Sequence, residues 1–500
     1  MPENYDVIVV GGGSAGAVLA ARLSAYPARR VLLLEAGPDY APSATPGAVA
    51  SSSLLGTHTG HDWGYLAEPG IGGQVIEVWR GRVLGGSSAV NGSVLTRARP
   101  ADFQRWTDRG VKGWAFDDVL PSFRKLEHTL AGTEEWHGRT GPMPVRQLGR
   151  SELSTMQLAF IAAAEAIGIP AVEDFNGPDA EGVGPYPMNV VNGIRVNTAM
   201  AYLTEAVRAR PNLEIRSGAM VDRVLFAGTR ATGVRLAGGT ELRAGEVVLS
   251  AGAYGSPAIL LRSGVGPAEH LAASDISLIA ELPVGRTLYD HPIYYNAYAA
   301  RPDRIGVQRP VIGAKVWTAS SGAYRDELDL HITATHLIDQ TLSPTGSAFV
   351  LAVALTRPVS CGALTLRSRN PFAPPRIELN FLAAPADRER LLEGVALSRR
   401  IGASAPLTDL IDHEMAPGGT VRTAAEVEAH ICTAVDTYHH PTSTVPMGAD
   451  DDPAAVVDRL GEVRGLAGLR VVDASILPDS PSAATNATVI MAAEHIAAEL

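Results

Sequence analysis

Two adjacent histidines near the end of the chain have the residue type for acid–base chemistry. His439 and His440 end a helix-like run, and Pro441 forces a turn directly after them. An imidazole has an unperturbed pKa of about 6.5, so it can be neutral at working pH and can remove the proton of a hydroxyl group. Adjacent side chains point in different directions in a helix or a strand, so we do not expect this pair to share one metal ion.

A glycine-rich turn near the N-terminus could bind a dinucleotide. Residues 5–10 are an apolar, β-branched run typical of a buried parallel strand, and Gly11, Gly13 and Gly16 follow as G-x-G-x-x-G before an apolar helical pattern. In such a unit the first glycine permits a tight turn, the second lets the backbone approach a pyrophosphate, and the third lets the helix pack closely on the strand. The N-terminus of the helix offers unpaired N–H groups to the phosphates.

An acidic residue completes this pattern. A second apolar run, residues 31–34, ends at Glu35, whose carboxylate can accept hydrogen bonds from an adenosine ribose. Strand, turn, helix and acidic residue together predict a dinucleotide site. The motif does not distinguish NAD from FAD, although its place at the start of the chain favours FAD.

Similar units recur far along the chain. Residues 81–92 are rich in glycine and other small residues, which indicates a backbone that passes close to a flat or bulky group. Residues 252–257 form another glycine cluster after the strand-like run 246–251, and residues 469–473 are a strand pattern that ends on an acidic residue. We therefore expect one nucleotide-binding domain assembled from non-contiguous pieces.

Length and composition limit the classes of protein. Five hundred residues exceed the ~250–300 at which single cores stop growing, so we expect two domains, or one large domain with a cap. The chain has 42 Lys+Arg against 53 Asp+Glu, a net charge of −11 without a basic run, which argues against a nucleic-acid partner. Cys361 and Cys432 alone cannot form a disulfide framework or a zinc site. The absence of a leader pattern and of an apolar run of ~20 residues predicts a soluble, cytoplasmic protein with no membrane span.

The glycine clusters and the histidine segment resemble signatures of the glucose–methanol–choline (GMC) oxidoreductases, a family of FAD enzymes. Residues 81–91 (GRVLGGSSAVN) and 252–266 (GAYGSPAILLRSGVG) are similar to its two signatures. Residues 62–65 (DWGY), 284–292 (VGRTLYDHP) and 440–448 (HPTSTVPMG) are similar to further family segments. The resemblance covers essentially the whole chain and points to the bacterial branch of alcohol and aryl-alcohol oxidases and dehydrogenases.

The resemblance implies an α/β fold with two domains. A Rossmann-like FAD-binding domain, similar to that of p-hydroxybenzoate hydroxylase, would be discontinuous and comprise residues 1–150, 195–290 and 441–500. A substrate-binding domain with an antiparallel, six-stranded sheet would comprise residues 151–194 and 291–440 and cover the flavin ring.

The resemblance also implies the residues of the site. In the family the histidine directly before the proline is catalytic, which makes His440 the expected general base and leaves His439 a structural role. Some relatives bond FAD covalently through a histidine at the position of Val90, so non-covalent FAD is expected here. No metal ion is expected. The expected FAD-binding residues are Gly11, Gly13, Ser14, Ala15, Gly16, Glu35, Ala36, Arg82, Gly86, Ser87, Asn91, Gly92, Val94, Val221, Ala251, Asp473, Ala474, Asn486 and Ala487.

One position departs from the family pattern. The family normally supplies an Asn or His across from the catalytic histidine, and the ungapped match places Ala484 there. A water molecule, His439 or another pocket group such as His336 could replace it, or the enzyme works without a partner. Relatives that act on pyridoxine-like alcohols also lack the second polar residue. Asn486, two positions on, is expected to face the flavin instead.

Two further histidines lie on one strand pattern. His331 and His336, within residues 328–337, are five positions apart. Because this is an odd number, they point to opposite faces of a regular strand. At most one of them can face a pocket, and both could be structural.

The function that the resemblance implies is FAD-dependent oxidation of a small alcohol, an aryl or furan alcohol among the candidates. The alcohol would become an aldehyde or ketone by hydride transfer to flavin N5, with O2 or another molecule as the electron acceptor. An alternative is a hydroxynitrile lyase-type reaction with a redox-idle FAD, which some members of this fold catalyse. An NAD-dependent dehydrogenase would leave the clusters at residues 81–91 and 252–266 unexplained.

Overall fold

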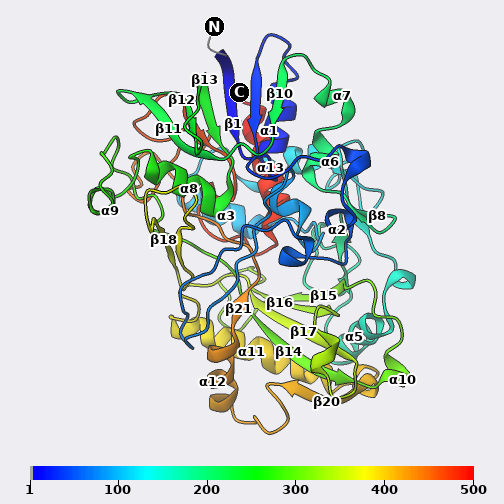
Figure 1. Cartoon of the computed structure of the whole chain (residues 1–500). Coiled ribbons are helices and arrows are strands. Elements are labelled where there is room, and N and C mark those ends of the chain that lie inside the picture. Colours follow the sequence, from blue (N-terminus) through cyan, green and yellow to red (C-terminus); the bar gives the residue numbers. More distant parts are fainter. Residues whose placement is uncertain (1–3) are drawn as a thin grey trace.

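The computed structural model of the chain describes residues 4–500, which fold around two seven-stranded β-sheets (Figure 1). The first sheet has the strand order β10-β2-β1-β13-β12-β11, and β22 pairs with β13. Strands β10, β2, β1, β13 and β22 are parallel, whereas β12 and β11 continue the sheet in antiparallel pairs. The strands are β1 (Asn4–Val10), β2 (Val31–Leu34), β10 (Leu213–Arg216), β11 (Val221–Ala227), β12 (Arg230–Leu236), β13 (Glu241–Leu249) and β22 (Leu469–Val471).

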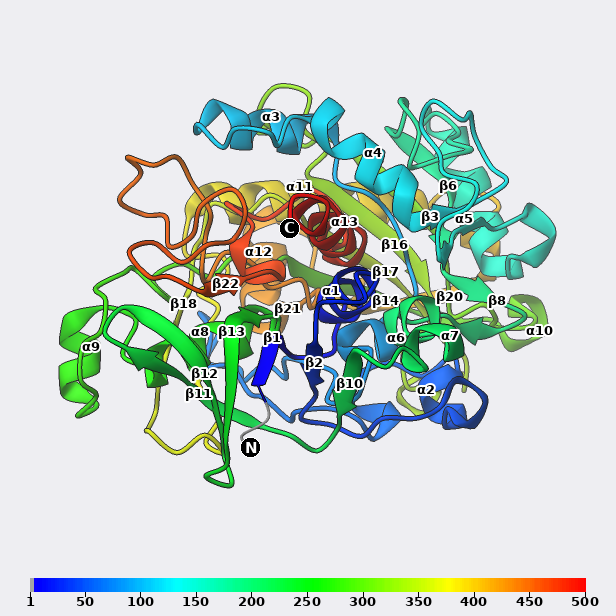
Figure 2. The same ribbon diagram turned by 90° about the horizontal axis from the view of Figure 1, so that it is seen from above.

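The centre of the first sheet is buried by helices. Residues 7–10 and 31–34 are buried throughout, as expected for parallel strands covered on both faces. Helices α1 (Gly16–Leu23) and α13 (Thr485–Ala497) pack against each other over this sheet, although 461 residues separate them (Figure 2). The N-terminal and C-terminal ends of the chain therefore build one domain together.

The parallel strands of this sheet end at one edge. The register pairs Val10 of β1 with Leu34 of β2 and with Leu249 of β13. The segments that follow these strands, from Gly11 and Glu35 among others, are therefore neighbours in space. In sheets of this type a ligand binds outside the carboxyl ends of the strands.

The second sheet is antiparallel and lies at the opposite end of the molecule in Figure 1. Its order is β20-β14-β17-β16-β15-β6, and the short β21 pairs with the start of β14. The strands are β6 (Gly182–Pro185), β14 (Pro292–Ala300), β15 (Ile312–Thr318), β16 (Leu330–Thr335), β17 (Ala348–Leu355), β20 (Ile411–Ala416) and β21 (Asp436–Thr437). The seventh strand, β21, corrects the six-stranded sheet that the resemblance implied. It leads directly into the histidine pair.

The two faces of the second sheet differ in what they contact. Leu330, Ile332 and Ala334 of β16 belong to the main apolar core, and α11 (Pro385–Gly402) and α5 (Thr155–Ala166) pack against the sheet. The alternate residues of β16, beginning with His331, line a cavity. The period-two alternation of the strand thus separates core from cavity.

All strands of the first sheet lie within residues 1–150, 195–290 and 441–500, and all strands of the second within residues 151–194 and 291–440. On this ground we propose the same division of the chain into two domains.

The remaining elements connect or cover the two sheets. No helix within residues 4–500 is long and apolar enough to cross a lipid bilayer. The other helices are α2 (Gly47–Ala50), α3 (Pro100–Asp108), α4 (Phe116–Leu126), α6 (Thr198–Tyr202), α7 (Glu205–Arg208), α8 (Gly252–Arg262), α9 (Ala268–Ala273), α10 (Pro302–Ile305) and α12 (Ala424–Ala434). Short strands pair as β3 (Glu127–His128) with β4 (Met143–Pro144), β5 (Arg146–Gln147) with β7 (Pro187–Met188), β8 (Val190–Val191) with β9 (Ile194–Arg195), and β18 (Ala363–Thr365) with β19 (Arg376–Glu378).

Candidate active site

A cavity of about 320 Å³ is lined by residues of both sheets. At one end lie the turns after the parallel strands of the first sheet, and at the other lie β14, β16 and β17 of the second sheet together with the histidine pair. Most of the residues predicted to form the site line this cavity. They are Gly11, Gly13, Ser14, Ala15, Glu35, Ala36, Gly86, Ser87, Asn91, Gly92, Val94, Val221, Ala251, His440, Asp473, Ala474 and Asn486.

Three of the predicted residues, Gly16, Arg82 and Ala487, lie outside the lining. A Cβ atom at Gly16 would lie 1.8 Å from the carbonyl oxygen of Gly11, so this glycine permits the close approach of helix and turn. The Arg82 guanidinium lies 5.0 Å from the centroid of the Trp63 ring. Ala487 is buried within α13.

The nucleotide end of the cavity has groups that fit a bound FAD. Helix α1 begins without a side-chain cap, and Gly13, Ser14 and Ala15 at its start line the cavity, so backbone N–H groups are available to phosphate oxygens. Nδ2 of Asn486 is buried in the lining without a hydrogen-bond partner among residues 4–500. A Cβ atom at Gly252 would meet nothing within 4 Å, so the backbone there borders open space.

The carboxyl group of Glu35, the residue after β2, accepts hydrogen bonds from two backbone N–H groups. The backbone N–H of Gly12 donates to Oε2 at 2.9 Å, and that of Gly37 donates to Oε1 at 2.7 Å. Burial raises the pKa of this carboxyl group to about 7, against the lowering effect of these hydrogen bonds. Each carboxyl oxygen keeps acceptor capacity for a further donor, such as a ribose hydroxyl.

At the other end, Asp290 fixes the backbone of the catalytic candidate. The N–H of His440 and the N–H of His291 both donate to Oδ1 of Asp290 at 2.7 Å, and the Thr437 hydroxyl donates to Oδ2 at 2.7 Å. Asp290 is 2% exposed, and burial raises its pKa to about 6. This carboxyl group therefore joins the start of β14 to the segment after β21.

The two imidazoles next to Asp290 form a chain of hydrogen bonds that sets their tautomers. Nε2 of His291 lies 2.9 Å from the carbonyl oxygen of Pro481, which can only accept, and 2.7 Å from the Ser480 hydroxyl, which can donate or accept. We assign the hydrogen to this nitrogen, because an unprotonated Nε2 would face the carbonyl oxygen as a second acceptor. Nδ1 of His291 lies 3.0 Å from Nδ1 of His440. Because a neutral ring has one N–H, Nδ1 of His291 accepts and Nδ1 of His440 donates. Nε2 of His440 is then left with a free lone pair on the cavity side.

Burial keeps both rings neutral. Desolvation lowers the pKa of His291 to about 3 and, with the neighbouring His291 ring and Arg80, lowers the pKa of His440 well below its usual value. A neutral His440 with an unprotonated Nε2 is the form that can accept a proton.

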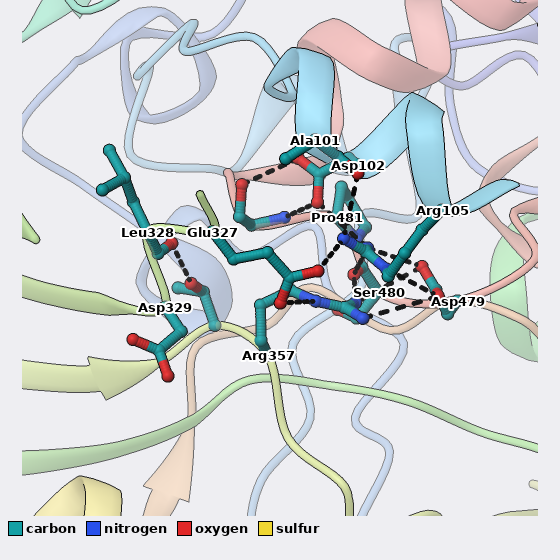
Figure 3. A network of polar contacts seen from close by, with 12 residues as sticks. Ala101, Asp102, Arg105, Glu327, Leu328, Asp329, Arg357, Asp479, Ser480 and Pro481 are labelled. Atoms are coloured by element: carbon teal, nitrogen blue, oxygen red, sulfur yellow. Dashed lines mark hydrogen bonds and ion pairs between the residues drawn. The ribbon is translucent and has the colours of Figure 1, made fainter. Parts of the chain in front are cut away.

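The segment that carries the Pro481 carbonyl is held by a network of ion pairs around Asp479 (Figure 3). Arg105 of α3 pairs with Asp479 at 2.9 Å and also contacts Glu327, while Arg357 contacts Asp479 at 3.3 Å and donates to the carbonyl of Ser480. These arginines hold the pKa of Asp479 well below its usual range, against the effect of its burial.

Asp102 of α3 holds the next residues of the same segment. It accepts from the N–H of Ser482 at 2.9 Å and from its hydroxyl at 2.7 Å. Residues 479–482, which we call the clamp segment, are thus fixed from α3 and from the end of β17. The clamp segment in turn orients His291.

His439 has a different environment from His440. Its ring stacks on Trp79, with centroids 4.4 Å apart, and its backbone adopts the left-handed conformation with φ 63°. Arg80 donates to its carbonyl oxygen at 2.6 Å, and burial lowers the pKa of the ring to about 3. His439 lines the cavity, but these contacts hold its ring against the wall.

The position that the family pattern pairs with His440 carries Ala484. Ala484 lines the cavity directly before α13, and Asn486 accepts a hydrogen bond from the Ser14 hydroxyl at 2.7 Å. His336 lies outside the cavity lining and contacts the Ser154 hydroxyl at 2.9 Å. The cavity-facing member of the strand pair is His331, in agreement with the expectation that at most one of the two faces a pocket.

Sequence reasoning missed His291 and Asp290. They lie within residues 284–292, which are similar to a segment of the family, but this similarity gives neither residue a chemical role. Their spacing from His440, 149 and 150 residues, gives no local signal. Among the described residues, no group of three or more His, Cys, Asp or Glu side chains is arranged to hold a metal ion.

Comparison with known proteins gives full-length matches. Profiles described as GMC oxidoreductase match residues 5–293 and 358–493. The chain is 35% identical to an oxygen-dependent choline dehydrogenase of Vibrio vulnificus, over 99% of this chain and 94% of that protein. It is 37% identical to the mitochondrial choline dehydrogenase of Mus musculus, over 99% and 89%. The crystal structure of pyridoxine 4-oxidase from Mesorbium loti superposes with a TM-score of 0.92 at 35% identity, over 99% of both chains.

Proposed function

The chain belongs to the GMC oxidoreductases, the FAD-binding enzymes that oxidise alcohols, and on that premise we propose that it oxidises a small alcohol to an aldehyde or ketone with His440 as the general base. The observation that carries the proposal is the 3.0 Å contact between Nδ1 of His440 and Nδ1 of His291. With the hydrogen of His440 assigned to Nδ1, the lone pair of Nε2 remains free in a residue that lines the cavity.

The proton transfer follows from this geometry. An alcohol bound in the cavity donates its hydroxyl hydrogen to Nε2 of His440, and the resulting imidazolium keeps its Nδ1–H bond to His291. Bound FAD supplies a hydride acceptor at N5 for the hydrogen on the adjacent carbon. Proton removal by a positioned base typically accelerates such a reaction by about 10²–10⁴-fold.

We propose that FAD is bound without a covalent bond. The position at which some relatives carry the linking histidine is Val90, an aliphatic side chain in the cavity lining. The groups available to FAD are the N-terminus of α1, the Glu35 carboxyl group and the amide of Asn486.

The relatives differ in substrate, and the names of two of them specify oxidation that involves oxygen. One is an oxygen-dependent choline dehydrogenase and the other is a pyridoxine 4-oxidase. We propose a small alcohol as the substrate, with aryl and furan alcohols as the first group to be tested and with O2 or another molecule as the electron acceptor.

The test is an anaerobic absorbance experiment on the purified FAD-loaded protein. Aryl, furan and aliphatic alcohols are added one at a time, and air is admitted afterwards. Bleaching of the oxidised-flavin band by an alcohol supports hydride transfer, and its rapid return in air identifies an oxidase. If no alcohol bleaches the band and the protein releases a carbonyl compound from cyanohydrins, the lyase alternative replaces this proposal.

A further inference from the structure

We propose that His331, with Lys315 buried beside it, forms a subsite for a ring hydroxyl group, and that the substrate is an aromatic alcohol carrying such a hydroxyl group. This inference rests on the proposed function, because the subsite belongs to the cavity that contains His440.

His331 is a buried residue of the cavity wall. It lies on β16, is 2% exposed and lines the cavity. Neither ring nitrogen has a hydrogen-bond partner among residues 4–500. Leaving a buried polar group unpaired is costly, so two unpaired nitrogens in a cavity wall indicate a ligand that satisfies them.

Lys315 lies beside His331 on the next strand. The register of β15 and β16 pairs Lys315 with Thr333 and Trp317 with His331, so these side chains share one face of the sheet. Lys315 is fully buried, and its Nζ has no hydrogen-bond partner among the described residues. Nζ lies 3.8 Å from the centroid of the Trp317 ring. The rings of Trp317 and His331 form a T-shaped pair with centroids 4.8 Å apart.

The charges around the subsite disfavour a cationic substrate. Among residues 4–500, the carboxylates in the cavity lining are Glu35 and Asp473, which follow strands β2 and β22 of the first sheet at the nucleotide end. No carboxylate of the described residues lines the end formed by the second sheet, where His331 lies. A quaternary ammonium group bound there has no anionic partner in that part of the chain.

The protonation of His331 favours a hydroxyl group over a carboxylate. Burial lowers the pKa of His331 well below its usual value, and the nearby Lys315, His291 and His440 lower it further. A neutral imidazole has one donor and one acceptor. A hydroxyl group also donates and accepts, whereas a carboxylate only accepts and leaves one nitrogen unpaired.

The walls between the subsite and the catalytic base suit a flat apolar ring. The ring of Tyr438 lies close to both histidines, with its centroid 6.3 Å from that of His331 and 4.6 Å from that of His440. Ile293 and Ala352 of the same sheet also line the cavity. One aromatic ring can therefore present its CH2OH group to His440 and its hydroxyl group to His331.

The test compares three pairs of substrates on the FAD-loaded enzyme: 2-, 3- and 4-hydroxybenzyl alcohol, each against the benzyl alcohol with methyl in place of the ring hydroxyl. We expect kcat/KM to favour the hydroxyl compound by at least about 10-fold in one pair. In His331→Leu this ratio falls to near 1. His336→Leu, five residues along the chain and outside the cavity, serves as the matched control and keeps the wild-type ratio.

Binding without turnover separates the subsite from the chemistry. 3-Methylphenol and 1,3-dimethylbenzene lack an oxidisable alcohol, so their dissociation constants, from tryptophan fluorescence of the wild-type protein, do not depend on catalysis. Tighter binding of the phenol supports the subsite even if His331→Leu does not fold or no alcohol is oxidised. Equal binding of the two, equal kcat/KM within every pair, or a kcat/KM for choline above that for every hydroxybenzyl alcohol would overturn it.

Discussion

At the scale of single residues, the reactivity of His440 depends on its neighbour His291. A buried histidine can carry its hydrogen on either nitrogen, and only the tautomer with a free Nε2 can act as a base towards the cavity. His291 sets the tautomer of His440. Nε2–H of His291 donates to the Pro481 carbonyl, 2.9 Å away, so Nδ1 of His291 is left as the acceptor for Nδ1–H of His440. We regard His291 as a positioning residue.

Substitution of His291 tests this role. His291→Leu removes the acceptor for Nδ1–H of His440, and we expect the rate constant of flavin reduction by alcohol to fall about 10–100-fold with little change in KM, because the base can adopt the wrong tautomer. His291→Asn, whose amide oxygen can accept the same hydrogen bond, should recover most of the rate. Stopped-flow absorbance measures both variants. Equal losses in Leu and Asn variants would indicate a packing role.

The pH profile gives an independent readout of the same pair. The base is active when neutral, and the lowered pKa of His440 keeps it neutral throughout the neutral range. The rate constant of flavin reduction in the wild-type protein should therefore show no step near pH 6.5, the usual pKa of a histidine.

At the scale of secondary-structure elements, the clamp segment connects the histidines to α3 and to the end of β17. Asp479 contacts Arg105 and Arg357 (Figure 3) and is almost completely buried. Pro481, two residues on, orients His291. The geometry of the catalytic pair thus depends on ion pairs that do not touch the cavity.

Asp479→Asn tests this connection. Removal of one partner of a buried ion pair typically costs about 3–5 kcal/mol, because the remaining charges are left uncompensated. We expect a loss of that size in the free energy of unfolding by urea, together with slower flavin reduction. Asp275→Asn is the matched control, since Asp275 pairs with Arg369 at 2.9 Å on the surface and its side chain is 97% exposed. The control should change stability by less than about 1 kcal/mol. A destabilised Asp479→Asn protein with an unchanged rate constant would contradict the positioning role of the clamp segment.

Elements were more predictable from sequence than the contacts between them. The strand before Gly11 and the helix after it have local signals, an apolar run and a glycine turn, and both occur in the structure. Helix α8 begins at Gly252, because the glycine cluster at residues 252–257 forms its first turns and not a separate turn before the helix. The hydrogen bond between His291 and His440 has no local signal, because it joins residues 149 positions apart.

At the scale of the whole molecule, the cavity exists only where the two sheets meet. The first sheet supplies the turns that fit a dinucleotide, and the second supplies an antiparallel face with His331 and the apolar wall. A ligand that spans this cavity contacts both sheets, so its binding stabilises their arrangement by RT ln(1 + [L]/Kd), about 2.7 kcal/mol at a free concentration 100 times Kd.

The mode of FAD binding can be tested on the whole protein. Because Val90 offers no linking group, precipitation of the FAD-loaded protein with acid should release all flavin into the supernatant, where its absorbance is measured. Added FAD should then raise the unfolding temperature of the apoprotein obtained by mild extraction. Yellow colour that stays with the washed precipitate would show a covalent bond and contradict this expectation.

The central claim is that His440 removes the hydroxyl proton during oxidation of an alcohol. The most direct measurement is the rate constant of anaerobic flavin reduction by stopped-flow absorbance, with the alcohol that bleaches the wild-type protein fastest. We predict that His440→Ala reduces this rate constant by about 10²–10⁴-fold while the FAD content stays at the wild-type level, and that His439→Ala, at the neighbouring position, loses much less. A rate constant in His440→Ala within about threefold of the wild-type value, with FAD fully bound, would contradict the claim.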